Sequence, residues 1–310
     1  MITSVPRNLF TGLATLVLCS FAFAQGSVGE PGRSGNGPNP LRNVYFGEQH
    51  LHTANSPDAF VVGTRGGWED AYNWAMGKEI TLSTTGEKIK RTTAPLDFVA
   101  ITDHAEYFGV MPRLVDPKDP LSKKDFGKKM QDKSIKPTDP GSPINTILGS
   151  LITGVPMKQF TTTDLLFDTW KEYVDTANKF YKPGEFTTLI AWEWTSIPNG
   201  RNMHRNVFFR GDGPAAPFSA FDSIYPQDLW TFLEIQRNEG RDCFAIPHNG
   251  NLSNGLMFSG KRYTSGNAID QAYASRRQRL ERRSARPVWM AVRGWPAPRG
   301  LARQWARAQP

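Results

Sequence analysis

The stretch Phe98-Val99-Ala100-Ile101-Thr102-Asp103-His104 decides the fold class, because in it an apolar run leads directly into an acid and a histidine. The run predicts a buried strand over residues 96–102. In α/β barrels and open sheets, functional groups converge at the carboxyl ends of such strands. The same order recurs three times, at residues 44–46 before His50 and His52, at 186–192 before Glu193, and at 243–246 before His248.

The segments between these strands carry apolar residues at helical spacing, which predicts helices over residues 68–76, 164–181 and 227–238. A further short strand is predicted over residues 206–209. Strands that alternate with helices indicate an α/β fold with a largely parallel sheet. We therefore predict one domain over residues 43–270, with a surface insertion at about 116–142, where Lys, Asp, Pro and Gly are dense.

The composition of the 310-residue chain is that of a globular protein, with 39% hydrophobic and 21% charged residues. Its net charge of +8 invites a nucleic-acid-binding hypothesis. Residues 271–310, however, hold ten arginines and one acid, a net +9, which leaves −1 for everything before Gln271. The body is electrically balanced, so we expect no nucleic-acid partner.

The N-terminus has the pattern of a cleaved secretory signal over residues 1–24. Arg7 supplies the positive start, residues 9–23 form an apolar run, and Ala22-Phe23-Ala24 is a small-x-small cleavage site. A membrane anchor is the alternative, but the run is shorter than the roughly 20 residues that span a bilayer. We expect a periplasmic or secreted protein, with a flexible linker over residues 25–42 and no stable membrane anchor.

All five histidines of the chain lie in short polar clusters next to predicted strands. Residues two apart in an extended segment point to the same side, so His50 and His52 can bind one metal ion together. His204 differs from the others because it precedes its strand, and it is expected to approach from a loop. Imidazole suits zinc, iron or manganese, and a carboxylate such as Glu193 can bridge two ions.

Each cluster alone also has a structural explanation. Asp103 could simply orient a buried His104, Glu193 could be a carboxylate buried between Trp192 and Trp194, and His248 could be a hydrogen-bonded loop residue. A buried carboxylate would still need a partner, because an unpaired buried charge is costly. The coincidence of all the clusters, with no histidine elsewhere, favours a metal site.

Five stretches together resemble an exported bacterial family of unknown function, DUF3604. They are Tyr45-Phe46-Gly47-Glu48-Gln49-His50-Leu51-His52-Thr53, Ile101-Thr102-Asp103-His104-Ala105-Glu106-Tyr107, Trp192-Glu193-Trp194-Thr195-Ser196, His204-Arg205-Asn206-Val207, and Ile246-Pro247-His248-Asn249-Gly250-Asn251-Leu252-Ser253-Asn254-Gly255. The first two are similar to motifs of the polymerase-and-histidinol-phosphatase (PHP) metallohydrolases. The resemblance implies a distorted β/α barrel with two or three divalent metal ions. By motif match, the implied ligands are His50, His52, His104, Glu193, His204 and His248, with Asp103 either a ligand or a residue that orients one.

The chain departs from this family near its C-terminus. Family members continue for roughly as long again, and a late Asp-x-His motif, which normally completes their metal set, does not follow His248 here. After Arg277 the sequence becomes rich in Arg, Trp, Ala and Pro. We expect residues 271–310 to be a basic tail that is out of frame from between 277 and 287, leaving the barrel incomplete; a genuine basic tail for an acidic partner is the alternative.

The leading functional hypothesis is hydrolysis of a phosphate or other small-molecule ester by metal-bound hydroxide. We predict Arg205 and Asp103 as catalytic residues, because a planar guanidinium next to the site suits an anionic oxygen; Arg205 could equally be a structural ion-pair partner. Asn249 and Asn251 are predicted to bind substrate, although turn chemistry explains them as well. The alternative function is a non-catalytic periplasmic protein that binds metal or a ligand, using tryptophans such as Trp68, Trp74, Trp192 and Trp194.

Overall fold

The computed structural model describes residues 44–281. The predicted signal peptide at 1–24, the linker at 25–42 and the part of the predicted tail that follows Glu281 lie outside the described residues. No helix in the described part is long and apolar enough to cross a membrane.

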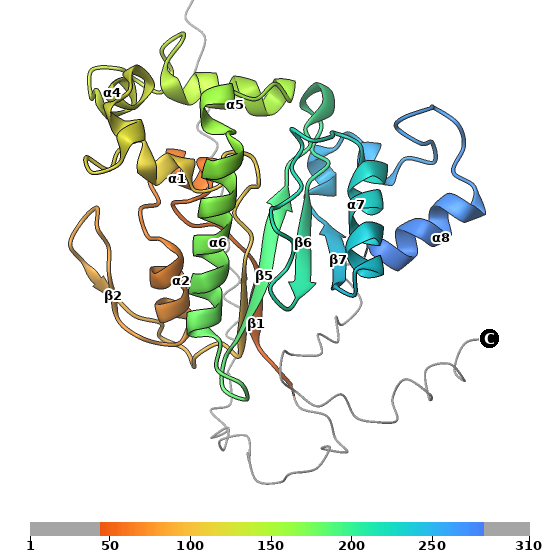
Figure 1. Cartoon of the computed structure of the whole chain (residues 1–310), viewed down its shortest axis with the longest axis horizontal. Coiled ribbons are helices and arrows are strands. Elements are labelled where there is room, and N and C mark those ends of the chain that lie inside the picture. Colours follow the sequence, from red (N-terminus) through yellow and green to blue (C-terminus); the bar gives the residue numbers. More distant parts are fainter. Residues whose placement is uncertain (1–43, 282–310) are drawn as a thin grey trace, which may run out of the picture. The chain divides into compact units, whose positions relative to one another are not determined.

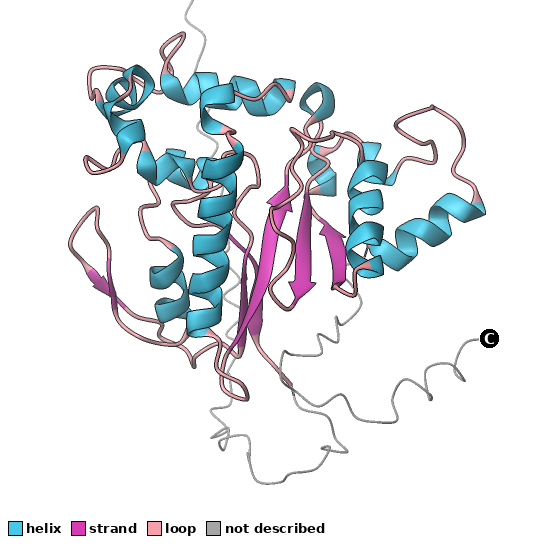
Figure 2. Cartoon of the chain, viewed as in Figure 1, coloured by secondary structure: helices cyan, strands magenta, loops and turns pink. Residues whose placement is uncertain are grey.

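The described chain alternates strands and helices (Figures 1 and 2). The strands are β1 (Gly47–Leu51), β2 (Ile80–Thr81), β3 (Lys88–Ile89), β4 (Phe98–Ile101), β5 (Thr187–Trp194), β6 (Arg205–Arg210) and β7 (Asp242–Pro247). The helices are α1 (Pro57–Val61), α2 (Trp68–Ala75), α3 (Val110–Arg113), α4 (Asp125–Gln131), α5 (Pro143–Thr153), α6 (Thr163–Phe180), α7 (Pro226–Asn238) and α8 (Gln271–Leu280). The predicted α/β class is confirmed, and the predicted helices correspond to α2, α6 and α7.

The main sheet has five strands in the order β1-β4-β5-β6-β7. Strands β1, β4 and β5 are parallel, whereas β6 runs antiparallel to both of its neighbours. The ten residues between β5 and β6 are too few for a parallel crossover, which needs a dozen or more. The sheet is therefore mixed, and within residues 44–281 it does not close into the predicted barrel.

The first strand begins later than predicted. Residues 44–46 lie outside β1, and Val44 and Phe46 are exposed. Gly47 starts the ladder by pairing with Phe98, and a Cβ at Gly47 would stand 2.4 Å from the Phe98 ring and carbonyl oxygen. Only glycine permits this close approach. As a result β1 includes His50, which was predicted to follow the strand.

The helices α2, α6 and α7 pack on one face of the sheet around the main apolar core. Trp68 from α2, Trp170 from α6 and Trp230 from α7 meet Trp192 and Trp194 of β5 in that cluster. Of the four tryptophans named for the binding-protein alternative, Trp68, Trp192 and Trp194 are buried in this core, whereas Trp74 is partly exposed. The opposite face of the sheet carries a smaller apolar cluster that includes Leu189 and Phe208.

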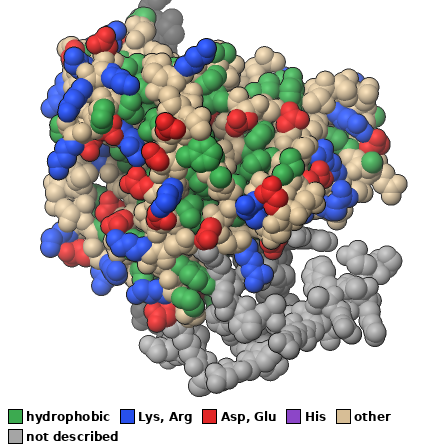
Figure 3. All heavy atoms as spheres, viewed as in Figure 1, with side chains coloured by type: hydrophobic (Ala, Val, Ile, Leu, Met, Phe, Trp, Pro, Cys, Tyr) green, Lys and Arg blue, Asp and Glu red, His purple; other side chains and the backbone are tan. Residues whose placement is uncertain are grey.

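The predicted insertion at 116–142 contains a short 3₁₀ turn (Pro120–Lys123) and α4. Its apolar side chains pack with α5 in a second cluster that includes Leu121, Ile147 and Leu151. On the face shown in Figure 3, basic and acidic side chains of the described residues are interspersed. That mixture agrees with the balanced charge of the body.

The last described segment, α8, packs on α7 and ends at a buried acid. The Oε1 atom of Glu281 accepts hydrogen bonds from Arg205 Nε (2.9 Å) and Trp230 Nε1 (2.8 Å), and its Oε2 accepts one from Arg277 Nε (2.7 Å). Arg205 and Glu281 are almost completely buried. This ion pair joins the end of α8 to β6, so the described domain continues past the predicted boundary at residue 270.

Candidate metal centre

Glu193 lies at the centre of the site and contacts four of the histidines. It lies near the carboxyl end of β5 and is 1% exposed. Successive side chains of a strand point to opposite faces, so Trp192 and Trp194 enter the helix-covered core while Glu193 points away from it. Its Oε2 atom lies 3.0 Å from His50 Nε2 and 2.9 Å from His52 Nε2. Its Oε1 atom lies 2.5 Å from His204 Nδ1 and 3.2 Å from His248 Nε2.

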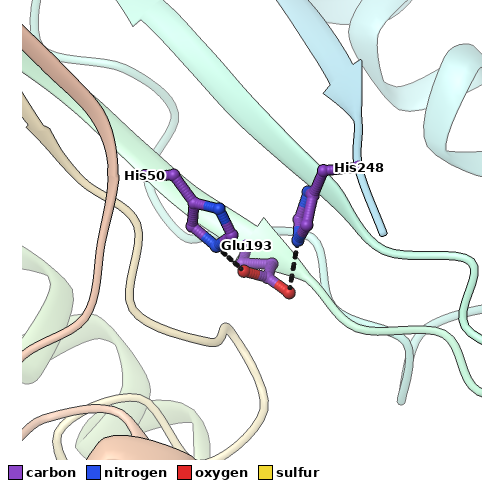
Figure 4. Close-up of side chains that lie close together, drawn as sticks. All are labelled: His50, Glu193 and His248. Carbon is purple, nitrogen blue, oxygen red and sulfur yellow. Dashed lines mark hydrogen bonds and ion pairs between the residues drawn. The ribbon is translucent and has the colours of Figure 1, made fainter. Parts of the chain in front are cut away.

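The histidines come from different parts of the sheet. His50 is on β1 and His52 follows it, and their Nε2 atoms are 3.1 Å apart, as the His-x-His spacing predicted. His248 follows β7, and Figure 4 shows His50 and His248 approaching Glu193 from two sides. His204 directly precedes β6. Because β6 is antiparallel, its amino end lies at the same edge as the carboxyl ends of β1, β5 and β7, so the strand direction brings His204 into the cluster.

Asp58 is a candidate ligand that sequence reasoning missed. It lies in the first turn of α1, and its Oδ1 atom is 3.0 Å from His52 Nδ1 while its Oδ2 atom is 3.4 Å from His104 Nε2. An acid in the first turn of a helix is ordinarily explained by the helix dipole. The sequence therefore gave no separate signal that Asp58 belongs to the site.

The donor set fits divalent metal ions. Three groups have ligand atoms within 4.8 Å of one another: His50–Glu193–His248, His52–Asp58–His104 and His104–Glu193–His204. Nitrogen donors with one or two carboxylates suit zinc, manganese or iron. Within residues 44–281, the buried Nε2 atom of His204 and Nδ1 atom of His248 have no hydrogen-bond partner, and buried polar atoms are normally satisfied.

A small cavity of about 230 Å³ opens at this cluster. It is lined by His50, His52, Asp58, His104, Glu193, His204 and Asn249. Among these described residues there is no Lys or Arg. The only side chains of this lining that can carry positive charge are therefore its histidines.

Asp103 lies behind the cluster and does not line the cavity. Its Oδ1 atom accepts the Thr53 N–H (2.5 Å), and its Oδ2 atom accepts the Thr53 hydroxyl (2.7 Å) and Trp68 Nε1–H (2.8 Å). Burial raises the pKa of this carboxyl, and the hydrogen bonds from Thr53 and Trp68 act in the opposite direction. Because Thr53 follows His52, Asp103 holds the end of the His-x-His segment in place. Its contacts are those of a residue that orients a ligand, rather than those of the predicted catalytic group.

Arg205, which was predicted to be catalytic, does not line the cavity. It pairs with Trp194 across the β5–β6 ladder, one position from the Glu193–Asn206 pair, so its side chain points to the opposite face from Glu193. The guanidinium binds Glu281 and also donates to the Met203 carbonyl oxygen. The alternative considered from sequence, a structural ion pair, describes these contacts.

The two predicted substrate-binding asparagines differ in position. Asn249 lines the cavity. It has a left-handed backbone conformation (φ 54°) and caps the 3₁₀ turn Gly250–Leu252. Asn251 lies within that turn, is exposed and does not line the cavity. The structure therefore brings only Asn249 to the candidate site.

The cluster concentrates negative charge on two carboxylates. Burial alone would lower the pKa of His52, but its bonds to Asp58 and Glu193 outweigh burial and raise that pKa to about 10. Burial opposes ionisation of Asp58 and Glu193, yet the surrounding histidines hold both carboxyl pKa values well below the ordinary range. Burial lowers the pKa of His204 despite its contact with Glu193. Without metal, protons on histidines such as His52 balance the two carboxylates.

We expect the apparent zinc affinity to rise with pH from about pH 6 to about pH 8, by about tenfold per unit for each proton displaced. Zinc requires neutral imidazole, whereas metal-free His52 keeps its proton up to about pH 10. The folding stability of the metal-free protein should change with pH in the opposite direction. Protonated His52 stabilises the fold fully below its ordinary pKa of 6.5, and this contribution is lost as the pH rises toward 10. Competition with a chromophoric chelator at several pH values measures the affinity, and a flat profile would contradict the expectation.

Comparison with known proteins gives a family for the chain. The model of a family described as proteins of unknown function (DUF3604) matches residues 39–285, which is most of the 310-residue chain. No curated protein and no solved structure matched significantly. The matched range contains every residue of the histidine–carboxylate cluster and also α8 with Glu281. The chain belongs to the DUF3604 family, as its five motifs predicted.

Proposed function

We propose that this protein is a metal-dependent hydrolase of a phosphate or other small-molecule ester. The observation that carries the proposal is the convergence of five histidines and two carboxylates in one cluster around Glu193, with four of those histidines lining a single cavity. Two or three divalent ions held there would lower the pKa of water to roughly 7 and stabilise charge on the attacked group. The location of the cluster at the strand ends of an α/β sheet also supports the proposal, because a metal site in a PHP-like barrel would lie at such strand ends.

The residues have distinct parts in this proposal. Glu193 would be a ligand shared between ions, since it belongs both to the group with His50 and His248 and to the group with His204. Asn249, whose side chain borders the cavity, would contact the substrate. The N-terminal signal pattern supports a reaction in the periplasm or outside the cell. Among the described residues no Lys or Arg lines the cavity, so the ions themselves would bind a phosphate or carboxyl oxygen.

The proposal predicts turnover of simple chromogenic esters by the metal-loaded chain. The purified protein would be loaded separately with zinc, manganese and iron and offered p-nitrophenyl phosphate, bis-p-nitrophenyl phosphate and p-nitrophenyl acetate. We expect hydrolysis of at least one ester, lost in the His50→Ala/His52→Ala variant. Asn251→Ala, an exposed residue outside the cavity, is the matched control and should keep wild-type rates.

The same experiment decides between catalysis and binding. Stoichiometric metal with no turnover of any ester would reject the hydrolase and favour the non-catalytic metal- or ligand-binding protein. Hydrolysis that persists unchanged in the double alanine variant would show that a contaminant or another site is responsible. Preference for the phosphate esters over the acetate would define the substrate class.

A further inference from the structure

A second polar residue, Thr195, directly follows the carboxyl end of β5, and its side chain contacts His104 of the cluster. It is 2% exposed, and its hydroxyl forms a short hydrogen bond with Nδ1 of His104. The other ring nitrogen of His104, Nε2, faces Asp58 Oδ2 at 3.4 Å. His104 therefore has one nitrogen on Thr195 and one on the candidate metal cluster.

The direction of the Thr195 hydrogen bond follows from its other partner. The hydroxyl has a single proton to donate, and it lies 3.4 Å from the carbonyl oxygen of Glu193, which can only accept. That carbonyl already accepts the Ala105 N–H at 2.9 Å, and it has a second lone pair for the hydroxyl. With its proton directed at Glu193, Thr195 would accept a hydrogen bond from His104, which would place the His104 proton on Nδ1.

The backbone of Thr195 is also fixed. Its N–H donates to Oε1 of Glu106 at 3.2 Å, and the same oxygen accepts the Ala220 N–H at 2.5 Å. Glu106 is itself buried. These bonds hold the backbone of Thr195 in position beside His104.

We infer that Thr195 is a positioning residue that fixes the tautomer of His104 and assigns its Nε2 atom to the ion beside Asp58. His104 otherwise belongs to two groups, one with His52 and Asp58 and one with Glu193 and His204. The nitrogen nearest to Glu193 is Nδ1, at 3.6 Å, and this is the nitrogen that Thr195 occupies. Thr195 thus removes His104 from the Glu193–His204 group. This inference rests on the metal centre of the proposed function, but not on ester hydrolysis.

Histidine-selective ¹⁵N labelling of the zinc-loaded full chain tests the inference directly. Long-range ¹H–¹⁵N correlation spectra should show His104 with a protonated Nδ1 and a zinc-bound Nε2; His104→Gln identifies its signals. Zinc on Nδ1 would overturn the inference, and so would a folded chain that binds no zinc. A chain that shows the expected His104 pattern without hydrolysing esters would keep the inference and reject the hydrolase.

Substitutions of Thr195 separate positioning from packing. Thr195→Val keeps the shape but loses the hydroxyl, and we expect it to weaken zinc binding at one site by about 10–100-fold, the usual cost of losing a partner of a ligand. Thr195→Ser should restore wild-type affinity. Thr188→Val is the matched control. Thr188 is a buried threonine at the start of β5, at the other end of the strand from Thr195, and its hydroxyl donates to the carbonyl oxygen of Ala177. Wild-type zinc affinity in Thr195→Val, or an equal loss in Thr188→Val, would contradict the assignment.

Discussion

Replacing Glu193 with glutamine is expected to lower zinc affinity by more than about 100-fold. Loss of a residue that only hydrogen-bonds to a metal ligand already lowers metal affinity by about 10–100-fold, and Glu193 would itself be a ligand. The carboxylate is 1% exposed and lies within 3.2 Å of four histidines, so no other acid can take its place at the centre. Any ester hydrolysis should fall at least as much. Competition with a chelator measures affinity, and initial rates on the best chromogenic ester measure activity.

The control for Glu193→Gln is Glu185→Gln, which changes an exposed acid before the same strand. It should leave zinc affinity and rate unchanged. Asp58 and Glu193 together raise the pKa of His52, and glutamine at 193 removes the second of these two charges, so metal-free His52 should titrate at lower pH than in the wild type. Unaltered zinc affinity in Glu193→Gln would show that Glu193 is a structural carboxylate and not a ligand.

Replacing Glu281 with alanine is expected to destabilise the fold by about 3–5 kcal/mol, because it leaves the Arg205 guanidinium buried without a counter-charge. The pair is almost completely buried, and Trp230 and Arg277 also bind this carboxylate. The measurement is urea unfolding followed by tryptophan fluorescence. Glu239→Ala, which breaks the exposed pair with Arg241, is the control and should cost about 0–1 kcal/mol.

The same pair predicts a pH dependence. Burial opposes ionisation of Glu281, but Arg205 and Arg277 outweigh burial and lower its pKa. A carboxyl with a lowered folded pKa stabilises the protein above its unfolded pKa of about 4.3, and the contribution is lost as pH falls. The stability gap between wild type and Glu281→Ala should narrow in acid. A destabilisation no larger than that of Glu239→Ala would contradict the structural role of the pair.

The sequence predicted most of the cluster because histidines and Glu193 stand at strand ends, where side chains from separate strands meet. The sequence could also have predicted that β6 runs antiparallel to its neighbours. His204 precedes its strand while the other histidines lie at or after the ends of theirs, and only a reversed strand brings such a residue to the same edge. The alternation of His204, Arg205 and Asn206 along β6 likewise places Arg205 on the far face.

Other features needed the three-dimensional structure. Asp58 has the ordinary pattern of an acid at a helix start, and only the folding of α1 against His104 and His52 shows its position. The start of β1 at Gly47 depends on close contact with Phe98, a residue 51 positions away in the chain. Thr195 follows a strand like a site residue, but its part depends on which nitrogen of His104 it contacts.

The most direct test of the metal centre is elemental analysis of the purified chain beside its His50→Ala/His52→Ala variant. Both proteins would first be shown to be folded by circular dichroism. We predict two or more divalent ions per wild-type chain and a loss of at least one in the variant. A folded wild-type chain that holds no metal, even after incubation with zinc, manganese or iron, would contradict the central claim.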